Sequence, residues 1–200
     1  MPVSYSKPSQ IAAAAPRTVQ VWIEAIADDP EAISAFEVAR RSLAAARGLK
    51  RLRRMRLIEI AGVRSAGENV REHLHESTQF YNPHKERCHV RWSEQEPPPC
   101  DAGERAVLIH ERGGERRSAA ERWWRHATGE SVQVREGVAW LITAESEAVG
   151  EALEAGLVTL RDRQHGLLCN PNAQELRGAG AGIPVPWFAA AKSAPKRKRS

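Results

Sequence analysis

Five residues that can bind metals gather in one region of the chain: His73, His75, His84, Cys88 and His89. Imidazole nitrogens and thiolates are ligands that zinc prefers, and residues spaced like His84 and Cys88 share one face of a helix. Asn82-Pro83 instead predicts a turn followed by a strand, where this spacing does not bring ligands together. Because no Cys-x-x-Cys pair accompanies them, the sequence predicts surface or hydrogen-bonded histidines and no metal site.

Catalytic and nucleotide-binding motifs are missing from the sequence. It contains no GxxxxGK[ST], GxGxxG, GxSxG or HExxH, the patterns that cradle phosphates, present a nucleophile or hold zinc. Cys88 and Cys169 have no neighbouring base, and the sequence predicts them as small buried residues. We therefore expect no catalytic residue, no cofactor and no activity from the chain alone, which leaves open a role as a subunit of an enzyme complex.

Two groups of residues are candidates for an interface. The first is the basic stretch 47–56, with Arg47, Lys50, Arg51, Arg53, Arg54 and Arg56. It suits nucleic acid, a phosphorylated ligand or an acidic partner, or it is a solvated strand edge whose charges block unwanted pairing. The second is Trp123-Trp124, of which one indole can face a sheet. The other is then an interface residue, or it lies under the linker or the tail.

The net charge of +5, from 30 Lys and Arg against 25 Asp and Glu, comes from the C-terminal end. Residues 192–200 hold five bases and no acid, so residues 1–191 are formally neutral, which disfavours a nucleic-acid-binding fold. The basic tail, Lys196, Arg197, Lys198 and Arg199, suits RNA, anionic lipid or an acidic protein, or serves solubility. Three cysteines, no signal layout and no long apolar run predict a cytoplasmic protein without a membrane segment.

A proline cluster divides the chain, because three consecutive prolines favour an extended linker. The predicted parts are a flexible leader (1–16), a first domain (17–94), a linker (95–103), a second domain (104–178) and a Gly-rich, basic flexible tail (179–200). Trp187 and Phe188 in the tail could still dock on the body.

Each half is predicted as β-α-β-β-α-β from its apolar periodicity. In the first half the strands are 18–26, 49–55, 57–63 and 87–92, with helices at 33–48 and 68–80; 49–63 is also readable as one bent strand. In the second half the strands are 105–111, 131–135, 138–143 and 174–177, with helices at 116–128 and 145–168. Val19 matches Val107, and Asn82-Pro83 matches Asn170-Pro171, at one offset of 88 residues. The fold class is therefore α+β, with tandem ferredoxin-like domains related by a pseudo-two-fold axis.

Short motifs in both halves resemble PurS, the small subunit of phosphoribosylformylglycinamidine synthase, across about residues 17–178. That family has Asp-Pro after its first strand, Val-Arg-x-Gly-Lys between its middle strands and Asn-Pro-x-x-Glu before its last strand. The matching residues here are Asp29, Pro30, Asn82, Pro83, Glu86, Arg135, Gly137, Asn170 and Pro171. The departures are Met55-Arg56-Leu57 at the turn of the first half, and Gly113-Gly114, Val138 and Gln174 in the second.

The resemblance implies a non-catalytic subunit of an amidotransferase-type ligase complex in purine biosynthesis. PurS bridges the glutaminase and the ATP-dependent synthetase and supports ammonia transfer between them, so these subunits are the implied partners. A tandem pair looks like a fused PurS dimer, and further homo-oligomerisation stays open. The alternatives are a nucleic-acid-binding protein that uses the basic stretch and the tail, and a small-molecule sensor with paired regulatory domains.

Overall fold

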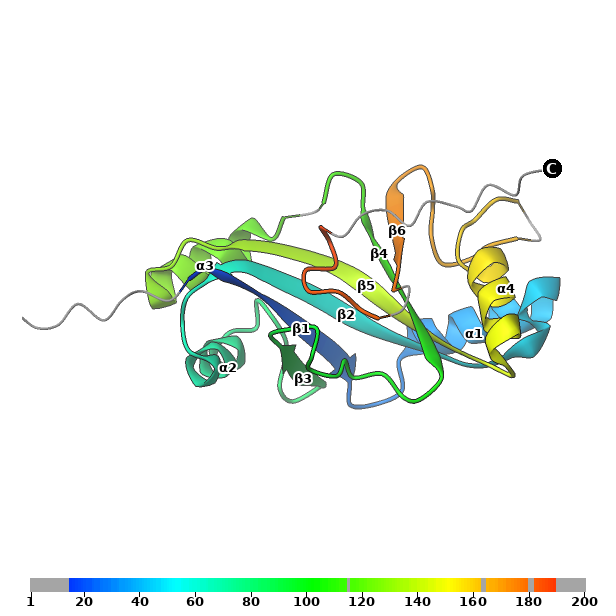
Figure 1. Cartoon of the computed structure of the whole chain (residues 1–200), viewed down its shortest axis with the longest axis horizontal. Coiled ribbons are helices and arrows are strands. Elements are labelled where there is room, and N and C mark those ends of the chain that lie inside the picture. The colour runs from blue at the N-terminus through cyan, green and yellow to red at the C-terminus, as the bar shows by residue number, and fades with distance from the viewer. Residues whose placement is uncertain (1–14, 115, 163–164, 180–181, 190–200) are drawn as a thin grey trace, which may run out of the picture.

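The structure, a computed structural model, describes residues 15–114, 116–162, 165–179 and 182–189 (Figure 1). Its strands are β1 (Arg17–Ala25), β2 (Leu49–Val63), β3 (Glu86–Arg91), β4 (Glu104–Glu111), β5 (Gln133–Ala144) and β6 (Gln174–Gly178). Its helices are α1 (Pro30–Ser42), the 3-10 helix η1 (Ala44–Gly48), α2 (Gly67–Glu76), α3 (Ser118–Thr128) and α4 (Glu147–Leu157). The protein is therefore of the α+β class.

The strands form one antiparallel sheet in the order β3-β1-β2-β5-β4-β6. The long central strands β2 and β5 pair with each other, so the two halves of the chain share a single sheet. The order reads the same from either edge when each element is exchanged for its counterpart in the other half. The halves thus contribute matching sets of strands in mirrored order.

All four α-helices pack on one face of this sheet. Alternate residues of a strand point to the same side, and the β2 residues on this side contribute to the cores beneath the helices. Ile58 and Ile60 of β2 lie in a core with α2 and α3, and Leu52 of β2 lies in a second core with α1 and α4. Figure 1 shows α2 and α3 at one end of the sheet and α1 and α4 at the other. The two cores therefore leave the middle of the helix-bearing face between them.

The opposite face is covered by a C-terminal strap, residues 182–189. Ile183, Trp187 and Phe188 of the strap are buried against apolar residues of the four inner strands, among them Trp22 and Leu57. The segment predicted as a flexible tail therefore contains a buried portion, and the Trp187 side chain is fully buried. The basic tail residues Lys196, Arg197, Lys198 and Arg199 lie outside the described residues, as does most of the predicted leader.

Each half contains three strands, so the prediction of four is wrong in number, whereas the alternative of one strand over residues 49–63 is confirmed by β2. The residues expected to form a turn at 55–57 lie inside β2, and Gly137 lies inside β5, where Leu57 is paired with it. Gly137 is required by packing and not by a turn, since a Cβ there would lie 2.8 Å from the Ile109 carbonyl oxygen of β4. β2 and β5 remain unbroken because they pair with each other along most of their length.

The second helix of each half is shorter than predicted. The expected helix at 145–168 is α4, which ends at Leu157, and the chain then folds back with the Leu167 N–H donating to the Leu157 carbonyl. Asn82-Pro83 and Asn170-Pro171 therefore precede the last strands but do not end the helices.

The two Asn-Pro loops have the same hydrogen-bond pattern. Asn82 Oδ1 accepts from the N–H two residues later at 3.0 Å, and Asn170 Oδ1 does the same at 3.0 Å. The backbone N–H of each Asn donates to the side chain four residues on, Glu86 at 2.7 Å and Gln174 at 3.0 Å. Matching loops at the offset of 88 residues support equivalent roles in the two halves.

We expect Asn82→Ala and Asn170→Ala each to lower the free energy of unfolding by about 1 kcal/mol, because each removes the acceptor of one backbone N–H. Urea denaturation of the two variants measures the loss. A clear loss in one variant and none in the other would contradict the equivalence of the loops.

Candidate functional site

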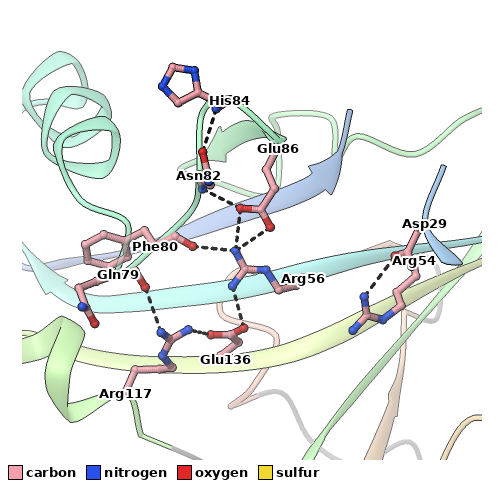
Figure 2. A network of polar contacts seen from close by, with 10 residues as sticks. All are labelled: Asp29, Arg54, Arg56, Gln79, Phe80, Asn82, His84, Glu86, Arg117 and Glu136. Carbon is pink, nitrogen blue, oxygen red and sulfur yellow. Dashed lines mark hydrogen bonds and ion pairs between the residues drawn. The ribbon is translucent and has the colours of Figure 1, made fainter. Parts of the chain in front are cut away.

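The basic stretch lies mainly on β2, at the centre of the sheet and not at its outer edge. Arg54 and Arg56 point to the helix-bearing face between the two cores (Figure 2). Arg54 donates to Asp29 at 3.2 Å and forms an ion pair with Glu31 at 2.8 Å. Asp29 also caps α1, accepting from the Glu31 N–H at 2.9 Å, so the Arg54 guanidinium is held against the start of that helix.

Arg56 is the centre of a second set of contacts, which joins the two halves. Its guanidinium donates to Glu86 at 3.1 Å, to the Phe80 carbonyl at 2.9 Å and to Glu136 of β5 at 3.2 Å. Arg117 contacts the other carboxylate oxygen of Glu136 and donates to the Gln79 carbonyl (Figure 2). We call Arg56, Arg117, Glu86 and Glu136 the central network; its two guanidinium groups face two carboxylates.

The arginines on the strap-bearing face of β2 are also paired. Arg53 makes a bidentate contact with Glu104, with both distances at 2.8 Å, and this contact raises the pKa of the Arg53 guanidinium. Arg51 pairs with Asp101 at 2.8 Å, where both side chains are more than half exposed. Arg47 and Lys50 are exposed. Most of the basic stretch is therefore neutralised within the protein, which weakens its interpretation as a nucleic-acid patch.

The two candidate tryptophans have different surroundings. Trp124 is a fully buried residue of α3, and its indole N–H donates to Glu130 at 3.1 Å. Trp123 is half-buried and meets the Phe80 and His73 rings edge-on, at centroid distances of 5.7 and 6.4 Å. Trp123 thus lies between α2 and α3, and contacts within the protein account for much of its surface.

The histidines and cysteines considered as metal ligands do not converge. Cys88 and His89 are neighbours on β3 and so point to opposite faces, whereas His75 contacts the Tyr81 hydroxyl at 2.9 Å. Across the described residues, no three His, Cys, Asp or Glu side chains are placed to hold a metal ion together. No helix in the described parts of the chain is long and apolar enough to cross a bilayer.

Burial makes the thiols poor nucleophiles. It raises the pKa of Cys88 and of Cys100 to about 11, and it also raises the pKa of Cys169. The thiolate is the reactive form, so a raised pKa lowers reactivity at neutral pH. These environments do not resemble that of a catalytic cysteine.

We expect iodoacetamide to alkylate Cys88 and Cys100 in the native protein about a hundredfold more slowly than an ordinary thiol near neutral pH. Mass spectrometry of timed samples measures the rates, and the same protein in guanidinium chloride is the control. Rapid alkylation of either residue in the native protein would contradict the assigned environment.

Sequence reasoning missed the buried polar residues Gln20, Glu59, Arg91 and His110. Glu59 accepts hydrogen bonds from the Trp187 and Phe188 N–H groups and from Gln20, and burial raises its pKa. Arg91 donates to Gln20 at 3.1 Å and to the Ile183 carbonyl at 2.8 Å. Gln20, Glu59 and Arg91 thus hydrogen-bond to the main chain of the strap. Their signal in the sequence is a polar residue among apolar neighbours in a strand.

The His110 side chain is held by contacts with other described residues. Its Nδ1–H donates to the Glu111 carbonyl at 2.9 Å, its Nε2 accepts from Arg177 at 3.1 Å, and its ring contacts Phe188. Burial lowers the pKa of this imidazole. With both ring nitrogens occupied in the neutral form, His110 is not available as a general base.

Two polar grooves are the main concave features near the basic stretch. One, of about 660 Å³, lies over the middle of the helix-bearing face and is lined by Arg54, Arg56, Arg117 and Glu136. The other, of about 610 Å³, lies beside the first part of β2 and the start of α1, and is lined by Ile26, Ile33 and Arg87 among others. Neither brings together a nucleophile, a base and an orienting group.

The motif residues taken from the PurS resemblance lie mostly at element starts. Asp29 and Pro30 are the N-cap and first residue of α1, and Asn82, Pro83 and Glu86 lead into β3. Asn170 and Pro171 lead toward β6, while Arg135 lies beside Gly137 inside β5. Comparisons of the chain with models of known families, with curated proteins and with solved structures find no match.

Proposed function

We propose that this protein is a non-catalytic assembly subunit, built as a fused pair of PurS-like units, which acts by binding the synthetase and glutaminase of a phosphoribosylformylglycinamidine synthase. The observation that carries the proposal is the single sheet in which two matching halves join through β2 and β5. A chain that replaces a homodimer would have this arrangement. The PurS resemblance supplies the partners and the role in ammonia transfer.

The strand registers support a pseudo-two-fold axis through the Leu57–Gly137 pair. Val19 pairs with Ile60, and its counterpart Val107 pairs with Trp140, so β2 residues correspond to β5 residues 80 positions later. By this correspondence Leu57 matches Gly137, and these two residues are also partners in the sheet. A two-fold axis exchanges each residue with its counterpart in the other half, so a residue that pairs with its own counterpart lies next to the axis.

The polar side chains of the central network and its surroundings are bound to one another within the protein, which is compatible with a role through partners. The carboxylates and guanidinium groups of the central network bind one another, and His110 has both ring nitrogens occupied. Burial raises the pKa of Cys88 and of Cys100 to about 11. An assembly subunit needs surfaces for its partners and no reactive groups.

Reconstitution tests the proposal. The purified protein is assayed with the amide substrate, ATP and glutamine, with and without the synthetase and glutaminase subunits, and the mixture is passed over a sizing column. We expect no turnover from the chain alone, and co-elution with stimulated glutamine-dependent turnover when the subunits are present. Turnover by the chain alone, or neither co-elution nor stimulation, would refute the proposal.

A chain truncated before Lys192 is the matched control, since it removes the basic tail and leaves the strap. Under the proposal it co-elutes as the full chain does. If the partner is RNA instead, binding of a single-stranded RNA falls on truncation and its dependence on salt becomes shallower.

A further inference from the structure

The first part of β2 has a free edge next to the groove of about 610 Å³. The last residue pair between β1 and β2 is Ile23 with Arg56, and β1 continues to Ala25 paired with β3 alone. The β2 residues before Arg56 therefore pair with β5 on one side and have no strand on the other. This edge faces the groove lined by Ile26, Ile33 and Arg53.

The backbone N–H and carbonyl groups of Leu52 and Arg54 point toward this free edge. In β5, Val134 directs both its N–H and its carbonyl away from β2, to Glu121 and to the Arg117 N–H. Backbone groups alternate in direction along an antiparallel ladder. The register from Ile60–Val134 to Leu52–Ile142 is unbroken, so Leu52 and Arg54 point away from β5. Neither makes a backbone hydrogen bond on that side to another described residue.

The second half closes the equivalent edge. Val134 corresponds to Arg54, and its carbonyl accepts from the Arg117 N–H at 2.9 Å while its N–H donates to Glu121 at 3.0 Å. Glu121 is the fourth residue of α3, and the fourth residue of α1 is Ile33. The first half thus carries an exposed apolar side chain where the second half carries the carboxylate that closes the edge.

The walls of the groove indicate what would occupy it. On the helix-bearing side, Ile33 is 51% exposed, and Phe36 and Leu52 line the groove beside it. Around the rim, Lys50 and Arg87 are exposed and make no ion pair with any described residue. Asp28 is an exposed acid on the same rim and also makes no ion pair with a described residue. Arg51 pairs with Asp101, which also lines the groove, so this pair adds no net charge. With two unpaired bases against one unpaired acid among its described residues, the rim carries one net positive charge.

We propose that this edge of β2, residues 51–54, binds an extended segment of a partner protein in which apolar and acidic side chains alternate. The added strand would accept from and donate to the free backbone groups of Leu52 and Arg54. Its apolar side chains would pack on Ile33 and Phe36, and its carboxylates would meet the cationic rim. The inference rests on the proposed function, because it names the surface and the kind of segment that an assembly partner uses.

A labelled short peptide in which Glu and Val alternate is the probe, with fluorescence anisotropy as the measurement. Ile33→Glu introduces at α1 the carboxylate that closes the equivalent edge at α3, and we expect it to weaken binding by about tenfold or more. Val38→Glu is the matched control. Val38 lies on the same helix, is 46% exposed and lies outside this groove, so its variant should bind within about twofold of the wild type.

Two further measurements test strand addition directly. The amide of Arg54 should exchange hydrogen faster than that of Val134 in the free protein, and should slow when the peptide binds. The same peptide with N-methylated backbone amides should not bind. Equal protection of the two amides in the free protein, equal effects of Ile33→Glu and Val38→Glu, or no binding of the peptide would overturn the inference.

The outcomes separate this inference from the proposed function. Peptide binding that is lost in Ile33→Glu, without co-elution of the synthetase and glutaminase, supports the edge and removes the purine assignment. If the synthetase and glutaminase co-elute equally with the wild type and Ile33→Glu, and the peptide does not bind, the inferred binding edge of β2 is wrong and the purine assignment stands. Concentration-dependent dimerisation that Ile33→Glu abolishes would give the edge to a second copy of this chain and would overturn the choice of partner.

Discussion

Replacing Trp187 with alanine is expected to lower the free energy of unfolding by about 3–5 kcal/mol, the cost of removing a buried Trp. Trp187 is fully buried on the strap-bearing face, 6.0 Å from the Trp22 ring centre, and its backbone N–H donates to the buried Glu59 carboxylate. Without the indole, the apolar residues around Leu57 and Leu108 lose their cover. Urea denaturation followed by circular dichroism measures the loss.

The truncation before Lys192 is the control for this effect, because it shortens the same end of the chain without removing Ile183, Trp187 or Phe188. We expect its unfolding free energy to stay within about 0.5 kcal/mol of the full chain, as for surface changes. A loss of less than about 1 kcal/mol in Trp187→Ala would show that the strap is not part of the stable core.

Replacing Glu136 with alanine is expected to lower the free energy of unfolding by about 2–3 kcal/mol, because two half-buried guanidinium groups lose their shared carboxylate. Glu136 contacts both Arg56 and Arg117, and its side chain is 19% exposed. Arg56 and Glu136 occupy matching positions on either side of the inferred axis. In a symmetric dimer these positions would carry like charges, so the opposite charges here adapt each half to the other.

Arg51→Ala is the matched control for Glu136→Ala, because it breaks an ion pair that is more than half exposed on both sides. Exposed pairs contribute little, so we expect a loss below about 1 kcal/mol. Chemical denaturation of both variants gives the comparison. Equal losses would mean that the central network contributes no more than a surface pair does.

Much of the local structure could be predicted from neighbouring residues. The alternation of Val19, Val21 and Ile23 predicts β1, and all three point to the helix-bearing core. Asp29-Pro30 predicts the start of α1, where Asp29 accepts from the Glu31 and Ala32 N–H groups. Gly129 ends α3 in the left-handed conformation that glycine favours. Each signal depends on residues only a few positions apart.

The errors arose where long-range pairing overrides a local signal. Gly137 was interpreted as part of a turn, but it lies inside β5. Glycine occupies this position because the close approach of β4 leaves no room for a Cβ. The basic stretch could be interpreted from the sequence only as a patch or a strand edge, because its carboxylate partners come from distant parts of the chain, among them Glu86, Glu104 and Glu136. No window of neighbouring residues contains both members of such a pair.

The sequence by itself determined the α+β class and the starts of most elements, since periodicity, caps and breakers act over a few residues, and it predicted a repeat at an offset of 88 residues. Only the tertiary structure decided that β2 and β5 join the halves into one sheet, that the strap covers its second face, and that one strand edge is closed by Glu121 while the other is left open beside Ile33. These features depend on which distant segments meet, and that choice is made by the burial of apolar faces and the pairing of charges in the folded chain as a whole.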